Sequence, residues 1–106
     1  MSLPAVFDTR ISVIKKGAAV IHENVVSVSK NEYVYRLTVL PRDFFRGEKK
    51  QFYSVSVSSL KDKSRSAFLR DFTSDRTTAD RFYHLLCLGG VAPEHLEDIY
   101  DDFMST

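Results

Sequence analysis

Several residue types that build cross-linked or cofactor-binding folds are scarce in this sequence. The single cysteine, Cys87, excludes a disulfide framework within the chain and a zinc site built from several cysteines. Four glycines leave little material for a phosphate-binding loop, and the chain contains no Gly-x-Ser-x-Gly nucleophile elbow. These absences favour a reduced cytoplasmic protein that is not an enzyme and holds no cofactor.

Long apolar runs are also missing. No segment approaches the roughly 18 apolar residues of a membrane-spanning helix. The N-terminus shows no charged-then-apolar signal pattern. We therefore expect no association with a membrane.

Lys and Arg are absent from the last quarter of the chain. All fifteen lie at or before Arg81, whereas residues 82–106 hold five acidic side chains. The net charge of +1 is thus divided into +6 for residues 1–81 and −5 for residues 82–106. This division predicts either a basic binding face or an acidic helix that lies near basic groups of its own or a second chain.

The composition is that of a soluble globular protein, with 43% hydrophobic and 27% charged residues. A length of 106 residues suits one domain. We therefore predict a single α+β domain over residues 1–106, with strands within about 6–72 and helices at about 76–88 and 93–104.

Alternating apolar and polar residues predict strands in the first two-thirds of the chain. In "FYSVSVSSL" (52–60), Tyr53, Val55 and Val57 share one face, and the serines at 54, 56 and 58 share the other. "YVYRLTVL" (33–40) alternates in the same way. Further strands are predicted at 9–15, 18–22, 25–29 and 66–72, with a hairpin turn at 30–32, and Pro41 is expected to end the 33–40 strand.

The apolar period changes to 3.6 residues after position 75. Asp75 or Thr77 is expected to cap the first helix, which the Gly89-Gly90 pair ends. Pro93 occupies the first turn of the second helix, in which Leu96, Ile99 and Phe103 are expected to be buried. These elements predict an α+β fold, an antiparallel β-sheet of four to five strands with a C-terminal two-helix hairpin packed on one face.

The segment "RDFTSDRTTADRFYHLLCLGGVAPEHLEDIYDDF" (70–103) resembles a family of short Gram-positive bacterial proteins that form a domain of unknown function. In that pattern, an acidic-aliphatic pair and Ser/Thr-Asp precede a helix, and a Pro-x-His-Leu-x-Asp motif opens a second helix. The matching residues are Asp71, Ser74, Asp75, Pro93, His95, Leu96, Asp98, Ile99, Asp102 and Phe103. The likeness covers about residues 33–104 and implies a compartment and a fold but no activity. Ala92 departs from the pattern, in which a serine N-cap is expected.

The same helix contains a candidate metal site. His95, Asp98 and Asp102 lie at i, i+3 and i+7 along one helix edge. However, the outer two positions are roughly 10 Å apart along the axis, and a metal site normally needs three or four convergent ligands. We therefore interpret Pro93, His95, Leu96, Asp98 and Asp102 as structural and predict no metal.

Two binding functions remain, and we favour a protein-interaction or regulatory module, with a homodimer formed through a sheet edge or an open sheet face. The alternative is a single-stranded nucleic-acid-binding module that uses the basic and aromatic segment 42–53. Against nucleic acid, the sequence pI is about 7.9, and no RNP, KH or helix-turn-helix signature is present. The candidate interaction surface consists of Arg36, Arg42, Phe44, Phe45, Arg46, Lys49 and Lys50.

Overall fold

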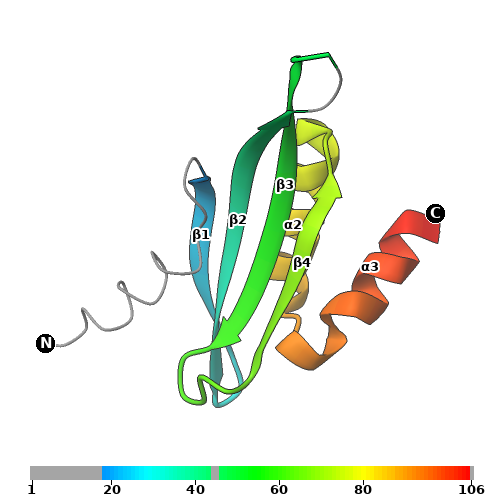
Figure 1. Cartoon of the computed structure of the whole chain (residues 1–106). Helices are drawn as coiled ribbons and strands as arrows, with labels where there is room; N and C mark the ends of the chain where they lie inside the picture. The colour runs from blue at the N-terminus through cyan, green and yellow to red at the C-terminus, as the bar shows by residue number, and fades with distance from the viewer. Residues whose placement is uncertain (1–17, 44–45, 106) are drawn as a thin grey trace, which may run out of the picture.

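The computed structural model describes residues 18–43 and 46–105. Within them, four strands form one antiparallel sheet in which each strand pairs with the next along the chain (Figure 1). The strands are β1 (Ala19–Val28), β2 (Asn31–Asp43), β3 (Lys49–Ser59) and β4 (Ser66–Thr73). The strand predicted at 9–15 lies outside the described residues.

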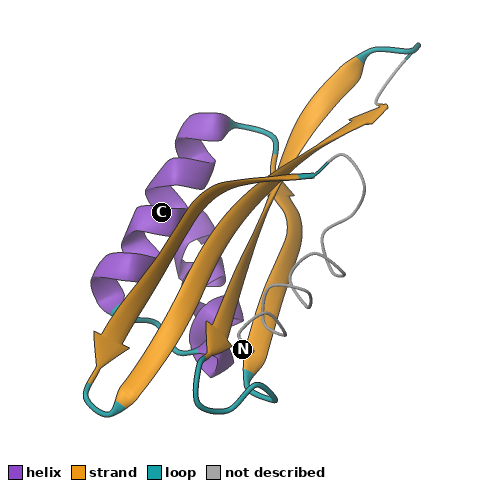
Figure 2. Cartoon of the chain, turned by 90° about the vertical axis from the view of Figure 1, so that its left-hand side faces the viewer, coloured by secondary structure: helices purple, strands orange, loops and turns teal. Residues whose placement is uncertain are grey.

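The chain then forms α2 (Arg76–Gly89), a short 3-10 turn η1 (Pro93–His95) and α3 (Leu96–Ser105). Both helices lie on the same side of the sheet (Figure 2). The predicted α+β fold, with an antiparallel sheet and two C-terminal helices on one face, is confirmed. The second helix differs slightly from the prediction, because its first turn is a 3-10 turn.

The core lies between the helices and the inward face of the central strands. Alternate residues of β2 and β3 are buried there, and the helices contribute a buried stripe that includes Phe82, Leu86 and Leu96. Burial of Leu96 was predicted correctly. Ile99 and Phe103 are instead half-buried, because α3 packs against β4 at the margin of the sheet.

Two tyrosine hydroxyls join the sheet to the helical layer. Tyr35 of β2 donates a hydrogen bond to the Val91 carbonyl oxygen at 2.8 Å, and Tyr83 of α2 donates to the Tyr35 carbonyl oxygen at 2.9 Å. Burial raises the pKa of Tyr35 to about 12 and raises that of Tyr83 as well. Both phenols therefore remain protonated donors at neutral pH, and they fix the position of α2 on β2.

Two of the predicted strand boundaries are wrong. Segments 18–22 and 25–29 were predicted as separate strands, but β1 is continuous, with an irregularity between Val20 and His22. Pro41 does not end its strand, since β2 continues to Asp43 and Pro41 pairs with Gln51. Among the described residues the last β1 pair is Ala19 with Val39, so no described strand needs the N–H that Pro41 lacks, and the proline is tolerated within β2.

Asp75 caps α2, as one of the two predicted alternatives. Its carboxylate accepts hydrogen bonds from the Thr78 hydroxyl and from the Thr78 N–H, the latter at 2.8 Å. These bonds lower the pKa of Asp75. At the other end, Gly90 adopts left-handed angles (φ 57°), and its N–H donates to the Cys87 carbonyl oxygen. The Gly pair therefore ends the helix as predicted.

An ion pair holds η1 against the sheet. The Arg65 guanidinium donates to both carboxylate oxygens of Glu94, at 2.7 and 2.8 Å, and lies 5.7 Å from the centre of the Tyr33 ring. Hydrogen bonds from Arg65 lower the pKa of Glu94 to about 2. The pair therefore stabilises the fold only while Glu94 is ionised.

We predict an acid-dependent loss of stability that Glu94→Gln removes. The folded-state pKa of Glu94 lies below its ordinary value of 4.5, so the contribution is complete above that value and is lost as the pH falls toward 2. Urea unfolding between pH 7 and pH 2 should show the free energies of unfolding of the parent and of Glu94→Gln converging as the pH falls. In an Arg65→Gln background the Glu94→Gln change should have no such pH dependence. If the difference in stability between the parent and Glu94→Gln stayed constant down to pH 2, the stabilising role of the Arg65–Glu94 ion pair would be contradicted.

Candidate interaction surface

One face of the sheet, here called the open face, points away from the helices. Strand pairing brings together on this face the residue pairs Val20–Thr38, Glu23–Arg36 and Val25–Val34 from β1 and β2. It adds Leu40–Phe52 from β2 and β3 and Ser56–Phe68 from β3 and β4. None of the apolar side chains among these belongs to the core cluster. The apolar residues of the open face are Val20, Val25, Val34, Leu40, Phe52 and Phe68.

Several apolar side chains of the open face are strongly exposed. Phe68 is 57% exposed, Val25 56% and Val20 43%, whereas Val34, Leu40 and Phe52 are half-buried. Within the described ranges, the helices cover only the opposite face (Figure 2). Single exposed apolar residues are ordinary, but a contiguous group on one face is typical of a binding surface.

Two pairs of charged groups lie within the open face, which also carries the exposed side chain of Lys50. Arg36 donates from Nε and Nη2 to one carboxylate oxygen of Glu23, at 3.0 and 2.6 Å, and its side chain is only 12% exposed. Arg42 lies 3.0 Å from Asp71. The face is therefore close to electrically neutral in these two regions.

Asp71 marks an irregular end of the open face. Between the pairs Val55–Leu69 and Tyr53–Thr73, β4 has two more residues than β3, and Asp71 adopts left-handed angles (φ 48°). Its N–H donates to the Ser54 hydroxyl at 2.9 Å, which explains why a serine is buried at that position. The bulge turns the Asp71 carboxylate toward Arg42.

The described members of the predicted interaction surface are divided between the two faces of the sheet and a turn. Arg42 and Lys50 pair across β2 and β3, which places them on the face of Leu40 and Phe52. Lys49 pairs with Asp43 on the other face, and their charged groups are 3.1 Å apart. Arg46 is exposed in the turn with left-handed angles (φ 50°). Phe44 and Phe45 lie outside the described residues, and Arg36 lies near the centre of the open face.

The C-terminal motif divides into buried and exposed residues. Pro93 and Leu96 are buried, as expected for structural residues, whereas His95, Asp98 and Asp102 are exposed. The His95 N–H donates to the Ala92 carbonyl oxygen at 3.0 Å, and Ala92 provides no side-chain cap. In residues 18–43 and 46–105, no group of three His, Cys, Asp or Glu side chains is arranged to hold a metal ion.

We predict that His95 contributes nothing to metal binding. Its neighbours Asp98 and Asp102 are exposed along α3, so an ion would have to draw them together against solvent. Calorimetry with Zn²⁺, Mn²⁺ and Mg²⁺ should give the same result for the parent protein and for His95→Ala. Stoichiometric binding tighter than about 10 μM that disappears in His95→Ala would overturn this interpretation.

A polar cluster between β1 and α2 was not predicted. The His22 ring stacks on the Tyr83 ring at 5.3 Å and lies 3.3 Å from the Asp80 carboxylate, while the Asn24 amide donates to the Tyr83 hydroxyl at 3.0 Å. Cys87 is half-buried beside it, and burial raises the pKa of its thiol. A protonated thiol is a poor nucleophile, so the cluster is suited to holding β1 on α2.

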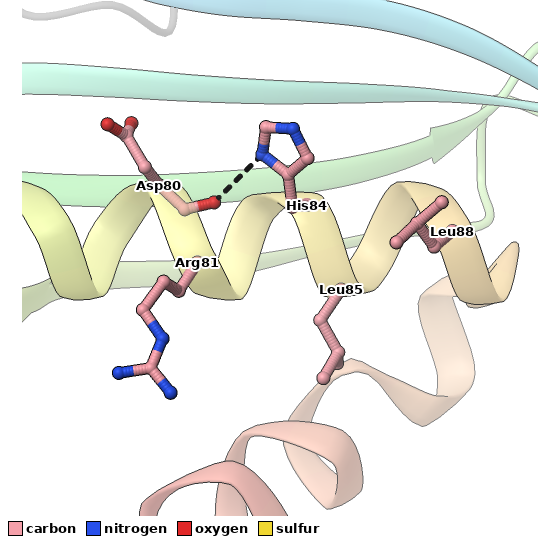
Figure 3. Close-up of a pocket in the computed structure, with 5 residues that line it drawn as sticks. All are labelled: Asp80, Arg81, His84, Leu85 and Leu88. Atoms are coloured by element: carbon pink, nitrogen blue, oxygen red, sulfur yellow. Dashed lines mark hydrogen bonds between the residues drawn. The ribbon is translucent and has the colours of Figure 1, made fainter.

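The outer surface of α2 carries a shallow hollow lined by Asp80, Arg81, His84, Leu85 and Leu88 (Figure 3). All five residues lie on one side of a single helix. Leu88 is 85% exposed, and the His84 ring contacts the Asp80 carbonyl oxygen of its own helix at 3.3 Å. The hollow therefore lacks the enclosing walls of a small-molecule site.

Sequence reasoning missed the two most exposed apolar residues of the open face, Val25 and Phe68. The alternation in "SAFLRDF" contained a signal, because Ala67 and Leu69 would face the core and leave Phe68 on the other side. The sequence gives no such signal for the Arg42–Asp71 ion pair, because the two residues are distant in the sequence.

The fold and this surface define a small two-layer α+β protein in which the described helices cover one face of the sheet (Figure 2). The chain belongs to a family of unknown function (DUF6514), whose sequence profile matches residues 17–106. No curated protein and no solved structure matches the chain. None of the described helices is both long enough and apolar enough to cross a membrane.

Proposed function

We propose that this chain is a non-enzymatic cytoplasmic protein-interaction module that binds another protein chain through its open face. The observation that carries this proposal is the exposure of more than half of Phe68 and Val25 on a face that the helices do not cover. Exposed aromatic residues of this kind supply much of the binding energy at protein interfaces. The single cysteine, whose thiol is half-buried with a raised pKa, agrees with a reduced compartment and with a non-catalytic role.

The test is affinity capture with the tagged full chain from a lysate of the source organism. We expect a specific protein to be captured by the parent and lost with Phe68→Asp or Val25→Asp. Leu88→Asp is the matched control, because it places the same charge on an even more exposed apolar residue of the helical layer. A partner that is lost with Leu88→Asp and kept with Phe68→Asp would refute the proposed surface.

The nucleic-acid alternative has one feature in its favour. Beyond the pairs Ala19–Val39 and Tyr53–Thr73, β2 and β3 continue as a two-stranded ribbon that extends past the rest of the sheet (Figure 1). It carries Arg42, Arg46, Lys49 and Lys50. However, two of these cations already face carboxylates, Arg42 at Asp71 and Lys49 at Asp43. Phosphates would have to compete with those partners, which weakens the electrostatic attraction that such binding needs.

We therefore predict no binding to mixed single-stranded DNA or RNA oligomers at about 50 mM salt. Fluorescence anisotropy of labelled oligomers is the measurement. If binding occurred and Arg46→Ala with Lys49→Ala reduced its salt dependence by about two charges, the ribbon would be a nucleic-acid site and the alternative would replace our proposal.

A further inference from the structure

We propose that the partner of the open face is a second copy of this chain, bound face to face about a two-fold axis. This inference rests on the proposed function and names the partner of the same surface. The resulting dimer would have four layers, with the two sheets packed in the middle and the helices of each copy outside. Three properties of the open face support it: its charge, its surface shape and its area.

The charge pattern allows the face to meet itself. In a two-fold contact each patch faces a copy of the same surface, so an unbalanced charge would meet its like. The Glu23–Arg36 and Arg42–Asp71 pairs neutralise four charged groups within each copy. The Arg36 side chain is only 12% exposed, and its two hydrogen bonds to Glu23 keep it close to the sheet. Two copies can therefore approach without repulsion at the Glu23–Arg36 pair near the centre of the face, whereas Arg42 and Lys50, side by side on the ribbon, have to remain outside the contact.

The surface shape of the open face is self-complementary. Its most exposed apolar side chains stand on the outer strands, Val20 and Val25 on β1 and Phe68 on β4, whereas β3 between them carries the small Ser54, Ser56 and Ser58. A two-fold axis parallel to the strands places β4 of one copy over β1 of the other. Because Phe68, Ser56, Arg36 and Glu23 lie in one row across the sheet, Phe68 then lies over β1 of its partner at the level of Glu23, between Val25 and Val20. The contact occurs twice in the same dimer, and the serines leave space between the two contacts.

The area of the face approaches that of a stable interface. Four strands about 4.8 Å apart, each with about eight residues rising about 3.3 Å, cover roughly 500 Å² in projection. The accessible surface is larger than this projection because side chains project from it. Standard stable complexes bury about 800 Å² on each partner. The sheet is thus large enough for a weak to moderate dimer without any contribution from the helical layer.

The first test is sedimentation velocity of the full chain at about 100 μM. We expect a mass of about twice the 12.1 kDa of one chain for the parent and for Leu88→Asp, and a monomer for Phe68→Asp and Val25→Asp. Because both residues are more than half exposed, these variants should remain folded, which circular dichroism checks. The dimer should also persist at high salt, since its ion pairs lie within each copy. A monomeric parent, or a Phe68→Asp dimer, would overturn the inference.

The second test fixes the geometry in a Cys87→Ala background. In a mixture of Val25→Cys and Phe68→Cys chains, a short bismaleimide cross-linker, which spans the distance between packed sheets, should join the two variants several-fold faster than it joins either variant to itself. Equal rates for all three pairings would contradict the axis parallel to the strands. The proposed function is tested separately. A monomeric parent that still captured another protein in a Phe68-dependent way would refute the second copy and leave the interaction module intact.

Discussion

Replacing Phe82 with alanine is expected to lower the free energy of unfolding by about 3–5 kcal/mol. Phe82 is fully buried in α2, and its ring lies 5.3 Å from Phe72, 5.6 Å from Tyr100 and 5.1 Å from Phe103. These aromatic contacts join β4, α2 and α3. Removing the ring would therefore leave a cavity at the junction of these three elements.

Urea unfolding followed by circular dichroism measures this effect. A domain of this size has a net stability of roughly 5–15 kcal/mol, so the expected loss is a large fraction of the total and should be plain in the unfolding curve. Leu88→Ala on the same helix is the control, because its side chain is 85% exposed, and it should change stability by less than about 0.5 kcal/mol. A loss below about 1 kcal/mol for Phe82→Ala would contradict the packing of the helices described above.

Gly90→Ala is expected to destabilise the protein by about 2–5 kcal/mol, from left-handed strain together with a steric clash. Gly90 has a φ of 57°, and a Cβ atom there would lie 2.5 Å from Cγ2 of Val28. The clash involves the end of β1 and the turn after α2, which are held together by the core. The methyl group that is met belongs to a short β-branched side chain with few alternative rotamers, so something has to shift to make room.

Two further variants separate the clash from the strain. Gly47 also has positive φ (82°), but a Cβ atom there meets nothing within 4 Å, so Gly47→Ala should cost only about 1–2 kcal/mol. Val28→Ala should be less harmful in the Gly90→Ala protein than in the parent, because it removes the atom that the new methyl group meets. Additive effects of Val28→Ala and Gly90→Ala would show that the two residues are not in contact.

Much of the fold could be predicted from local pattern. The serine alternation in β3, the Asp75 cap and the glycine pair at 89–90 each express a preference of the backbone itself, and each was found where expected. Pro41 was misread because its effect depends on whether a neighbouring strand needs its N–H. That neighbour, β1, ends its pairing at Val39, which no local pattern in the sequence reveals.

The candidate surface was harder to predict for the same reason. Basic residues such as Arg42 suggested a nucleic-acid site because their acidic partners, here Asp71, lie far away in the sequence and are brought close by strand pairing. Phe68 was assigned to a strand, but which of its two faces the helices cover is a property of the assembled layers. The exposure of Phe68 therefore became visible only in the folded protein.

The most direct test of the proposed surface is an isotope-filtered nuclear Overhauser measurement on a mixture of labelled and unlabelled full-length chains. It detects contacts between copies and ignores those within one copy. We predict cross-peaks between the Phe68 ring of one copy and the Val25 methyl groups of the other, because the two-fold axis places β4 over β1. Intermolecular cross-peaks that arise instead from Leu85 and Leu88 of α2, or no intermolecular cross-peaks at about 1 mM protein, would contradict the proposal that two copies of this chain meet through the open face.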